Sequence, residues 1–153
     1  MSSPRLRGPW DAAAVAAFLD AECSPLRLAV TWPGGAPLVV SLWFAHEAGA
    51  LWCASHRNAR LTEALARAPE VGFEVSVNEP PYRGVRGQGR AHLLPEAGAA
   101  RLEVLLDRYL GDRESNLARW LLSRAEDEVA IRIEPDWLTA WDFSARMGGG
   151  PGR

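Results

Sequence analysis

The sequence predicts a mainly β fold, an antiparallel barrel of six or seven strands with short helices between them. Three observations predict this class. Several short runs alternate apolar with polar residues, the period-two pattern of half-buried strands. Turns containing proline or glycine separate these runs, and the helical patterns between them are short. The strand expected over residues 82–94 carries Gly84, Gly87 and Gly89, which indicates bulges, barrel bending or close approach of another surface.

The expected elements follow one another without an internal repeat. In order they are helix 10–21, strand 25–32, strand 38–45, strand 51–54, helix 60–68, strand 71–77, strand 82–94, helix 96–110, helix 115–125, strand 128–134 and strand 137–143. We interpret the first helix as a lid or brace. One domain is expected over residues 1–146, followed by a disordered glycine-rich tail over residues 147–153.

The strand expected over residues 38–45 is apolar on both faces. On one face lie Leu38, Val40, Leu42 and Phe44, and on the other lie Val39, Ser41, Trp43 and Ala45. Such a strand must be covered on both sides, by the barrel interior on one side and by a ligand or second subunit on the other. The turn Glu47-Ala48-Gly49 leads back into the paired strand 51–54.

Polar side chains follow directly after that paired strand. Ser55, Arg57 and Arg60 lie at the start of the helix expected over residues 60–68. Free backbone N–H groups at a helix N-terminus favour an anion, and hydroxyl and guanidinium groups add to this preference. An apolar wall that ends in a phosphate-sized polar pocket suits a nucleotide-like cofactor. An exposed polar helix start explains the same residues equally well.

Composition and charge narrow the range of partners. The 153 residues carry a formal net charge of -2, which gives no electrostatic reason to expect nucleic acid or an acidic membrane. No apolar run approaches a membrane span, and residues 1–10 lack the core of a signal peptide, so a cytoplasmic protein is expected. All 17 Lys+Arg residues are arginine, which excludes a lysine Schiff base. We interpret the acidic run 126–128 as solvated charge.

The usual catalytic and metal-binding motifs are missing. The sequence contains no G-x-S-x-G, H-E-x-x-H or C-x-x-C pattern. Two of the three histidines, His46, His56 and His92, could form a metal site with Glu47, but ordinary surface or core histidines are the favoured interpretation, so we expect no metal. Trp43 and Trp52 could line a planar ligand, and they could equally fill a barrel core or a subunit interface.

Several degenerate motifs occur in a specific order over most of the chain. They are Pro25-Leu26-Arg27-Leu28-Ala29, the strand 39–44, the strand 51–55, the helix pattern Arg60…Leu65…Pro69, the strand 85–91 and the C-terminal IRIEPDWLTAWDFS. In this order and spacing the chain resembles the pyridoxamine 5'-phosphate oxidase-like proteins, the FMN-binding split barrels. The resemblance implies a six- to seven-stranded antiparallel split barrel.

The resemblance also implies which residues bind the cofactor. The family's strand along the flavin ring corresponds to Val39, Val40, Ser41, Leu42, Trp43 and Phe44. Ala54 and Ser55 correspond to a pair that contacts FMN, and Arg60 corresponds to the arginine of the family's Ser-Arg-Lys phosphate motif. Arg57 could supply further positive charge at that end. No residue of this chain is expected to act as a catalytic acid or base, because the flavin supplies the redox chemistry in this family.

Some family positions carry other residues in this chain. The serine and lysine of the phosphate motif are Ala59 and Leu61. The arginine and lysine that flank the ring strand in pyridoxamine-phosphate oxidases are Val39 and Phe44, and a glutamine that contacts flavin is Gly84. Because the residues that bind the substrate anion are absent, the biosynthetic oxidase activity is not expected.

The resemblance implies an FMN-dependent oxidoreductase, a homodimer that acts on an unidentified small molecule. FMN is preferred because the polar end over residues 55–60 suits one phosphate, whereas the sequence indicates no extended polar surface for a longer cofactor. Two alternatives stay open. One is a reductase that uses the deazaflavin coenzyme. The other is a barrel that binds flavin or haem without turnover, or that has lost its cofactor and serves as an interaction module.

Overall fold

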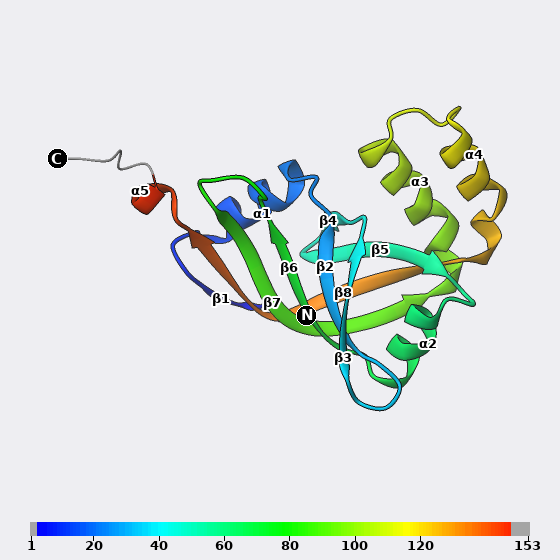
Figure 1. Ribbon diagram of the computed structural model, residues 1–153, viewed down its shortest axis with the longest axis horizontal. Coiled ribbons are helices and arrows are strands. Elements are labelled where there is room, and N and C mark those ends of the chain that lie inside the picture. Colours follow the sequence, from blue (N-terminus) through cyan, green and yellow to red (C-terminus); the bar gives the residue numbers. More distant parts are fainter. Residues whose placement is uncertain (1–2, 148–153) are drawn as a thin grey trace.

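The computed structural model describes residues 3–147 (Figure 1). Its strands are β1 (Arg5–Arg7), β2 (Leu26–Thr31), β3 (Pro37–Leu42), β4 (Ala45–Glu47), β5 (Ala50–His56), β6 (Glu70–Ser76), β7 (Arg83–Leu94) and β8 (Glu128–Asp142). Its helices are α1 (Ala12–Ala21), α2 (Arg60–Arg67), α3 (Gly98–Tyr109), α4 (Asn116–Ser123) and α5 (Ser144–Met147), with short 3-10 turns η1 (Pro95–Ala97) and η2 (Ala125–Asp127). Within residues 3–147, no helix is both long and apolar enough to cross a bilayer.

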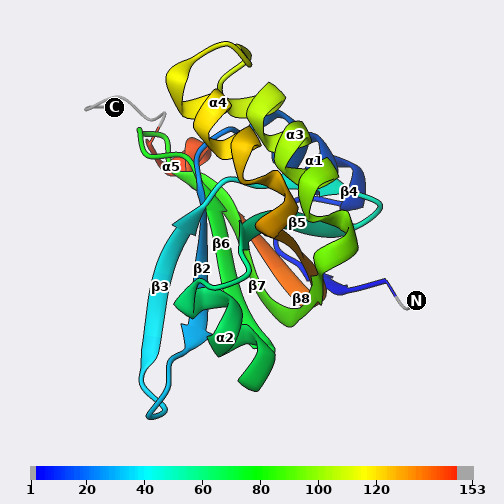
Figure 2. The same cartoon turned by 90° about the vertical axis from the view of Figure 1, so that its right-hand side faces the viewer.

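The strands form one curled sheet (Figure 2). Their order is β3-β2-β6-β7-β8-β5-β4, with antiparallel neighbours throughout, and β1 adds a parallel pair to β8. The two edge strands of this order, β3 and β4, are consecutive in the chain and are joined by Trp43 and Phe44. The barrel is therefore closed on this side by a short piece of chain rather than by a ladder of hydrogen bonds.

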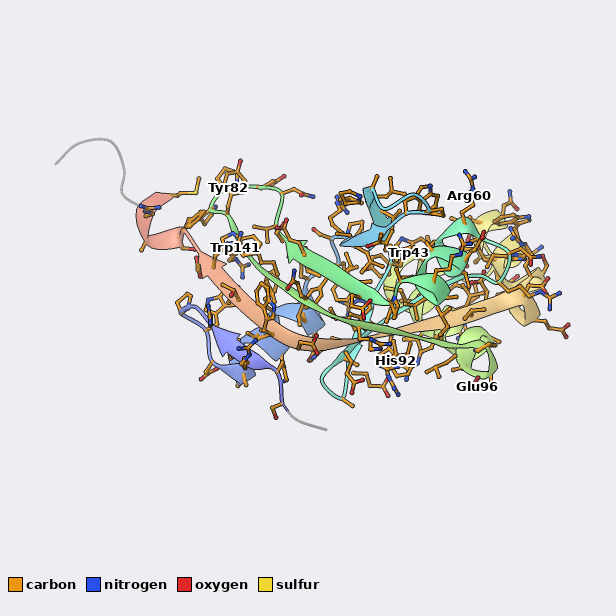
Figure 3. All side chains as sticks on the ribbon, turned by 90° about the horizontal axis from the view of Figure 1, so that it is seen from below. Trp43, Arg60, Tyr82, His92, Glu96 and Trp141 are labelled. Atoms are coloured by element: carbon orange, nitrogen blue, oxygen red, sulfur yellow. The ribbon has the colours of Figure 1, made fainter. Side chains whose placement is uncertain are left out.

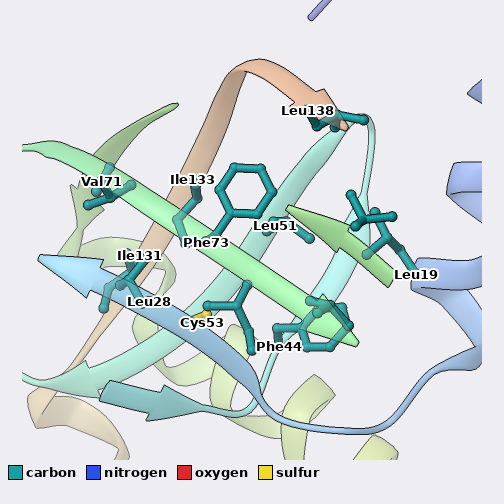
Figure 4. Packing of buried hydrophobic residues seen from close by; sticks show 14 of the residues in the cluster. Leu19, Leu28, Phe44, Leu51, Cys53, Val71, Phe73, Ile131, Ile133 and Leu138 are labelled. Carbon is teal, nitrogen blue, oxygen red and sulfur yellow. The ribbon is translucent and has the colours of Figure 1, made fainter. Parts of the chain in front are cut away.

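The inner side of the curled sheet holds the main hydrophobic core. In β5, Leu51 and Cys53 face this core, and Trp52 between them faces outward. Figure 4 shows them packed with residues of the other strands, among them Leu28, Phe73 and Ile131. Full burial of a side chain of this size contributes about 1.5–3 kcal/mol. A one-residue slip of any strand would expose its whole apolar set, so the core fixes the register of the sheet.

The helices cover different parts of the barrel. α1 packs beside β4, and α2 packs beside β2, β5 and β7. α3 lies on the outer face of β5 and β8, and α4 packs on α3 (Figure 2). Between α3 and α4 lies a second, smaller core of Leu102, Leu106 and Ala118. The outer face of the sheet is thus covered by helices at the β5 end.

Glycine lets β7 bend and approach its neighbours closely. A Cβ at Gly84 would lie 2.6 Å from the carbonyl oxygen of Val75. At Gly89 the pairing with β8 shifts, since Gln88 pairs with Trp137 but Gly89 pairs with Pro135. The bulge and the close approach that the glycine density predicted are both present.

The predicted fold class, an antiparallel barrel with flanking helices, is confirmed, and four details differ. The strand expected over 38–45 is wrong in extent, because the chain crosses there from one sheet edge to the other. The strands expected over 128–134 and 137–143 are one continuous strand, since the bulge accommodates Pro135 within it. β1 was not expected. Of the tail expected over 147–153, Met147 ends α5, and residues 148–153 lie outside the described part of the chain.

Candidate functional site

The ring-contacting segment expected over 39–44 is divided between two surfaces. Val40 and Leu42 pack against the main core, and Phe44 is fully buried within it. Val39 and Ser41 alternate with them, so they lie on the outer face, where both are exposed. A ligand on the outer face therefore meets the side chains of these two residues, and it can reach Val40 and Phe44 only through their backbone.

A cavity of about 230 Å³ brings four of the expected residues together. These are Ser41, Leu42, Trp43 and Ala54, which come from β3, the β3–β4 connection and β5. The remaining walls are Leu102 and Leu105 of α3, Leu121 of α4 and Glu128 of β8. The cavity is mainly apolar, and its two polar side chains, a hydroxyl and a carboxyl, lie where a ligand with a polar edge could bind.

The carboxyl of Glu128 lines this cavity, which the sequence did not lead us to expect. Glu128 pairs with His56 in the β5–β8 ladder and is 7% exposed. Burial raises the pKa of its carboxyl, and the neighbouring His56 and Arg124 oppose this effect. Such a group donates a hydrogen bond when protonated and accepts one when ionised. The interpretation of residues 126–128 as solvated charge is wrong for Glu128, because α3 and α4 cover the start of β8.

Neither tryptophan of the central strands is free on both faces. Trp43 stacks on Tyr109 of α3, with ring centroids 5.3 Å apart and an interplanar angle of 10°. The Tyr109 hydroxyl also accepts a hydrogen bond from the backbone N–H of Phe44, which fixes the connection to β4. Trp52 lies under the guanidinium of Arg101, 3.8 Å from its ring centroid, and does not line the cavity. Of the two, only Trp43 is placed to contact a ligand there.

Arg60 is the first residue of α2, and the uncapped N-terminus of this helix is accessible to an anion. The N-cap residue, Ala59, has no side-chain hydrogen bond to the first turn, so the first backbone N–H groups have no cap. The exposed Arg60 guanidinium lies 5.8 Å from the ring centroid of Trp32, at the start of the β2–β3 hairpin. Figure 3 shows Trp43 and Arg60 on one side of the β7 and β8 ribbons and His92 on the other.

Ser55 and Arg57 do not join Arg60 in a shared anion-binding site. Ser55 alternates with the outward-facing Ala54 and does not line the cavity. The Arg57 guanidinium is 3.0 Å from a carboxylate oxygen of Asp127, and its backbone N–H donates to the Asp127 carbonyl. The charge of Arg57 is therefore already matched by a carboxylate.

A shallow trough of about 610 Å³ lies on the outer face of the sheet. It is lined by Arg27, Ala29, Val39, Gly72, Phe73, Glu74, Arg86, Gly87, Gln88 and Trp137. The two hollows adjoin because Arg27 pairs with Ser41 across β2 and β3. Sequence reasoning missed this surface. The alternating pattern of each strand reveals which of its polar residues face outward. That Arg27 pairs with Glu74, and Glu74 with Arg86, becomes apparent only in the folded sheet.

The histidines considered for a metal site are held apart by other partners. His46 Nδ1 is 3.0 Å from an Asp20 carboxylate oxygen, and His56 Nε2 is 3.7 Å from Asp127. Glu47 pairs with Arg101. Over residues 3–147, no group of three or more His, Cys, Asp or Glu side chains is placed to hold a metal ion.

No protein-family model matches the chain. Among curated proteins, it is similar to a hydroxyneurosporene desaturase from Cereibacter sphaeroides, with 35% identity over 123 residues, which is 78% of this chain. The chain spans 25% of the length of that relative.

Several solved structures share the fold over most of the chain. A conserved hypothetical protein from Mycobacterium tuberculosis has a TM-score of 0.77 and 24% identity, covering 99% of this chain and 96% of its own. An F420 reductase has a TM-score of 0.66 and 25% identity, covering 78% and 92%. A Listeria innocua protein assigned as a pyridoxamine 5'-phosphate oxidase has a TM-score of 0.62 and 19% identity, covering 81% and 92%.

The same fold is found in a protein named for storage rather than for catalysis. HutZ, the heme storage protein from Vibrio cholerae, has a TM-score of 0.60 and 19% identity, covering 80% of this chain and 89% of its own. Proteins with this fold therefore differ in what they bind.

Proposed function

We propose that this chain, a member of the pyridoxamine 5'-phosphate oxidase-like split-barrel fold family, is an FMN-dependent oxidoreductase that acts on a small molecule. One observation carries the proposal. The cavity joins Ser41 and Trp43 to Ala54 beside a buried carboxyl. Arg60 does not line this cavity, but it begins α2, whose first turn has no side-chain cap. When bound, the flavin supplies the redox chemistry, and the protein holds and orients it.

Each end of the site suits a different part of FMN. The apolar walls and Trp43 suit the ring, and the Ser41 hydroxyl and Glu128 carboxyl can hydrogen-bond its polar edge. The uncapped first turn of α2 and the Arg60 guanidinium suit one phosphate. Arg57 contributes less than the sequence indicated, because Asp127 already neutralises it.

The cofactor site is completed, in this proposal, by a second copy of the chain. β3 is an edge strand, and its outward residue Val39 is 63% exposed beside the trough. Exposed apolar surface of this kind is commonly covered by a two-fold partner. Such a partner would also cover the face of the ring that the cavity leaves open.

A deazaflavin-dependent reductase is the second candidate, and a specific observation favours it. The trough beside the cavity carries Arg27 and Arg86, which could bind an acidic tail longer than a single phosphate. The likeness to an F420 reductase, at 25% identity, points the same way. FMN is ranked first because the Arg60 guanidinium and the uncapped first turn of α2 suit a single phosphate.

Titration of the apo-protein with FMN, FAD and the deazaflavin coenzyme, read by quenching of cofactor fluorescence, tests this ranking. Stoichiometric binding with FMN tightest supports the proposal. Tighter binding of the deazaflavin supports the second candidate instead, and binding of none contradicts both. Bound cofactor is then reduced anaerobically and mixed with electron acceptors. Reoxidation by an acceptor supports an oxidoreductase, and its absence with every acceptor supports a binding protein without turnover.

A further inference from the structure

A second cavity, of about 280 Å³, lies between α1 and the sheet and shares no lining residue with the candidate cofactor site. One wall is the stripe of α1 formed by Ala12, Val15, Ala16 and Leu19. The other walls are Ser3, Pro4, Leu6, His46, Gly49, Leu51, Pro135 and Leu138. Figure 4 shows Leu19 at the edge of the core, with Leu51 and Leu138 on the strands beside it. These three side chains are almost fully buried and make the cavity apolar.

The sequence of α1 explains why this space is not filled. Two of the four residues on the stripe are alanine, so the helix offers little volume at those positions. The C-terminal end of the helix is held by another element, which limits its approach to the sheet. Arg108 donates to the backbone carbonyls of Leu19, Asp20 and Glu22 at distances of 3.0, 2.8 and 2.7 Å.

His46 provides a polar group in this apolar wall. Its side chain is 16% exposed, and its Nδ1 is 3.0 Å from an Asp20 carboxylate oxygen. A carboxylate only accepts, so Nδ1 carries the proton in the neutral ring, and Nε2 is left as an acceptor. Within residues 3–147, no hydrogen bond to Nε2 is formed. A ligand hydroxyl in the cavity can therefore donate to it.

We propose that this cavity binds a small apolar alcohol or phenol. The hydrocarbon part lies against the stripe of α1 at Ala12 and Ala16, and the hydroxyl donates to His46 Nε2. An apolar protein cavity of roughly 150 Å³ holds benzene, so a cavity of this size suits two fused rings or a medium-length alkyl chain. The proposal does not rest on the proposed cofactor, because the two sites have separate walls.

Calorimetric titration of the full chain with 2-naphthol and with naphthalene tests the proposal. We expect one saturable site for 2-naphthol. Ala16→Phe fills the cavity from α1 and should weaken that binding at least about tenfold, while Ala13→Phe on the exposed face of the same helix should leave it unchanged. Circular dichroism and thermal melting establish that each variant is folded. Ala12→Leu, nearer the exposed edge of the helix, replaces Ala16→Phe if the larger side chain prevents folding.

The role of His46 is separated from that of the apolar walls by a second comparison. His46→Leu should weaken 2-naphthol binding about three- to tenfold, the usual effect of one lost hydrogen bond, and should leave naphthalene binding unchanged. Absence of saturable binding by the wild-type chain, or equal binding by the wild type and Ala16→Phe, would overturn the proposal. Equal weakening of both ligands by His46→Leu would overturn the hydrogen bond to Nε2.

Discussion

At the scale of single residues, Glu128 is the clearest case of an environment that changes the chemistry of a side chain. Its raised pKa means that the folded protein holds a proton on Glu128 more tightly than the unfolded chain does. Stability contributed by this group is therefore largest below the unfolded pKa and falls as the pH rises through the folded pKa. The buried carboxyl is a cost to the fold at neutral pH.

We predict that Glu128→Gln raises the melting temperature at pH 7 and has little effect near pH 4. The amide keeps the shape and hydrogen-bonding capacity of the protonated acid but removes the buried charge. Thermal melting of both proteins over this pH range measures the difference. A variant that melts below the wild type by the same amount at every pH would contradict the claim that burial of the Glu128 carboxylate costs stability.

The two cysteines differ in burial, and therefore in reactivity. Burial raises the pKa of the Cys53 thiol to about 12, whereas Cys23 is exposed. A thiol attacks only as the thiolate, so Cys53 should be inert in the folded protein. We predict that a disulfide reagent titrates one thiol in native protein and two in denaturant. Rapid reaction of both thiols in the native state would show that the core around β5 opens readily.

At the scale of elements, α1 depends on one side chain from another helix. Arg108 of α3 donates three hydrogen bonds to carbonyls at the C-terminal end of α1, where a cation also favours the helix dipole. These hydrogen bonds connect α1 to α3, the helix that lies on the outer face of the sheet.

We predict that Arg108→Met destabilises the protein by about 1.5–3 kcal/mol, the cost of losing hydrogen bonds from a charged group. Arg119→Met is the control, because its ion pair with Glu114 is exposed and such pairs contribute about 0–1 kcal/mol. Denaturant unfolding gives the two free energies, and hydrogen exchange should show the Arg108 variant losing protection first in α1. Equal effects of the two substitutions would contradict the bridging role of Arg108.

The sequence allowed most elements to be predicted, because alternation and periodicity are local properties. The errors arise where the tertiary structure decides. Residues 5–7 form β1 only because β8 offers an edge for parallel pairing. Pro135 marked a break between strands, but the bulge against Gln88 and Gly89 keeps β8 continuous. The structure also brings only some of the expected site residues together. Arg57 forms an ion pair with Asp127, and no local sequence pattern reveals this contact.

At the scale of the whole molecule, the outer face of the sheet is the surface that the single chain leaves least covered. α3 covers it over β5 and β8, but β3 presents Val39 to solvent beside the trough. The expectation that the strand over 38–45 needs cover on both faces therefore remains a prediction about a second copy of the chain.

We predict that the protein is a dimer at micromolar concentration and that Val39→Arg shifts it toward monomer. In a two-fold interface that covers the trough, this charge would be buried next to Arg27 and Arg86. Val104→Arg is the matched control, because Val104 is also exposed but lies on α3, outside the trough. Sedimentation velocity measures both. A monomeric wild type with cofactor bound would contradict the dimer.

The central claim is that the cofactor phosphate binds at the N-terminus of α2, beside the Arg60 guanidinium. The most direct test compares FMN affinity of Arg60→Ala with that of Arg67→Ala, an exposed arginine at the other end of the same helix. Loss of a charge-assisted contact should weaken FMN binding about tenfold to a hundredfold in the first variant. The second variant should bind FMN as the wild type does. Wild-type affinity in Arg60→Ala, or equal weakening in both variants, would contradict the claim.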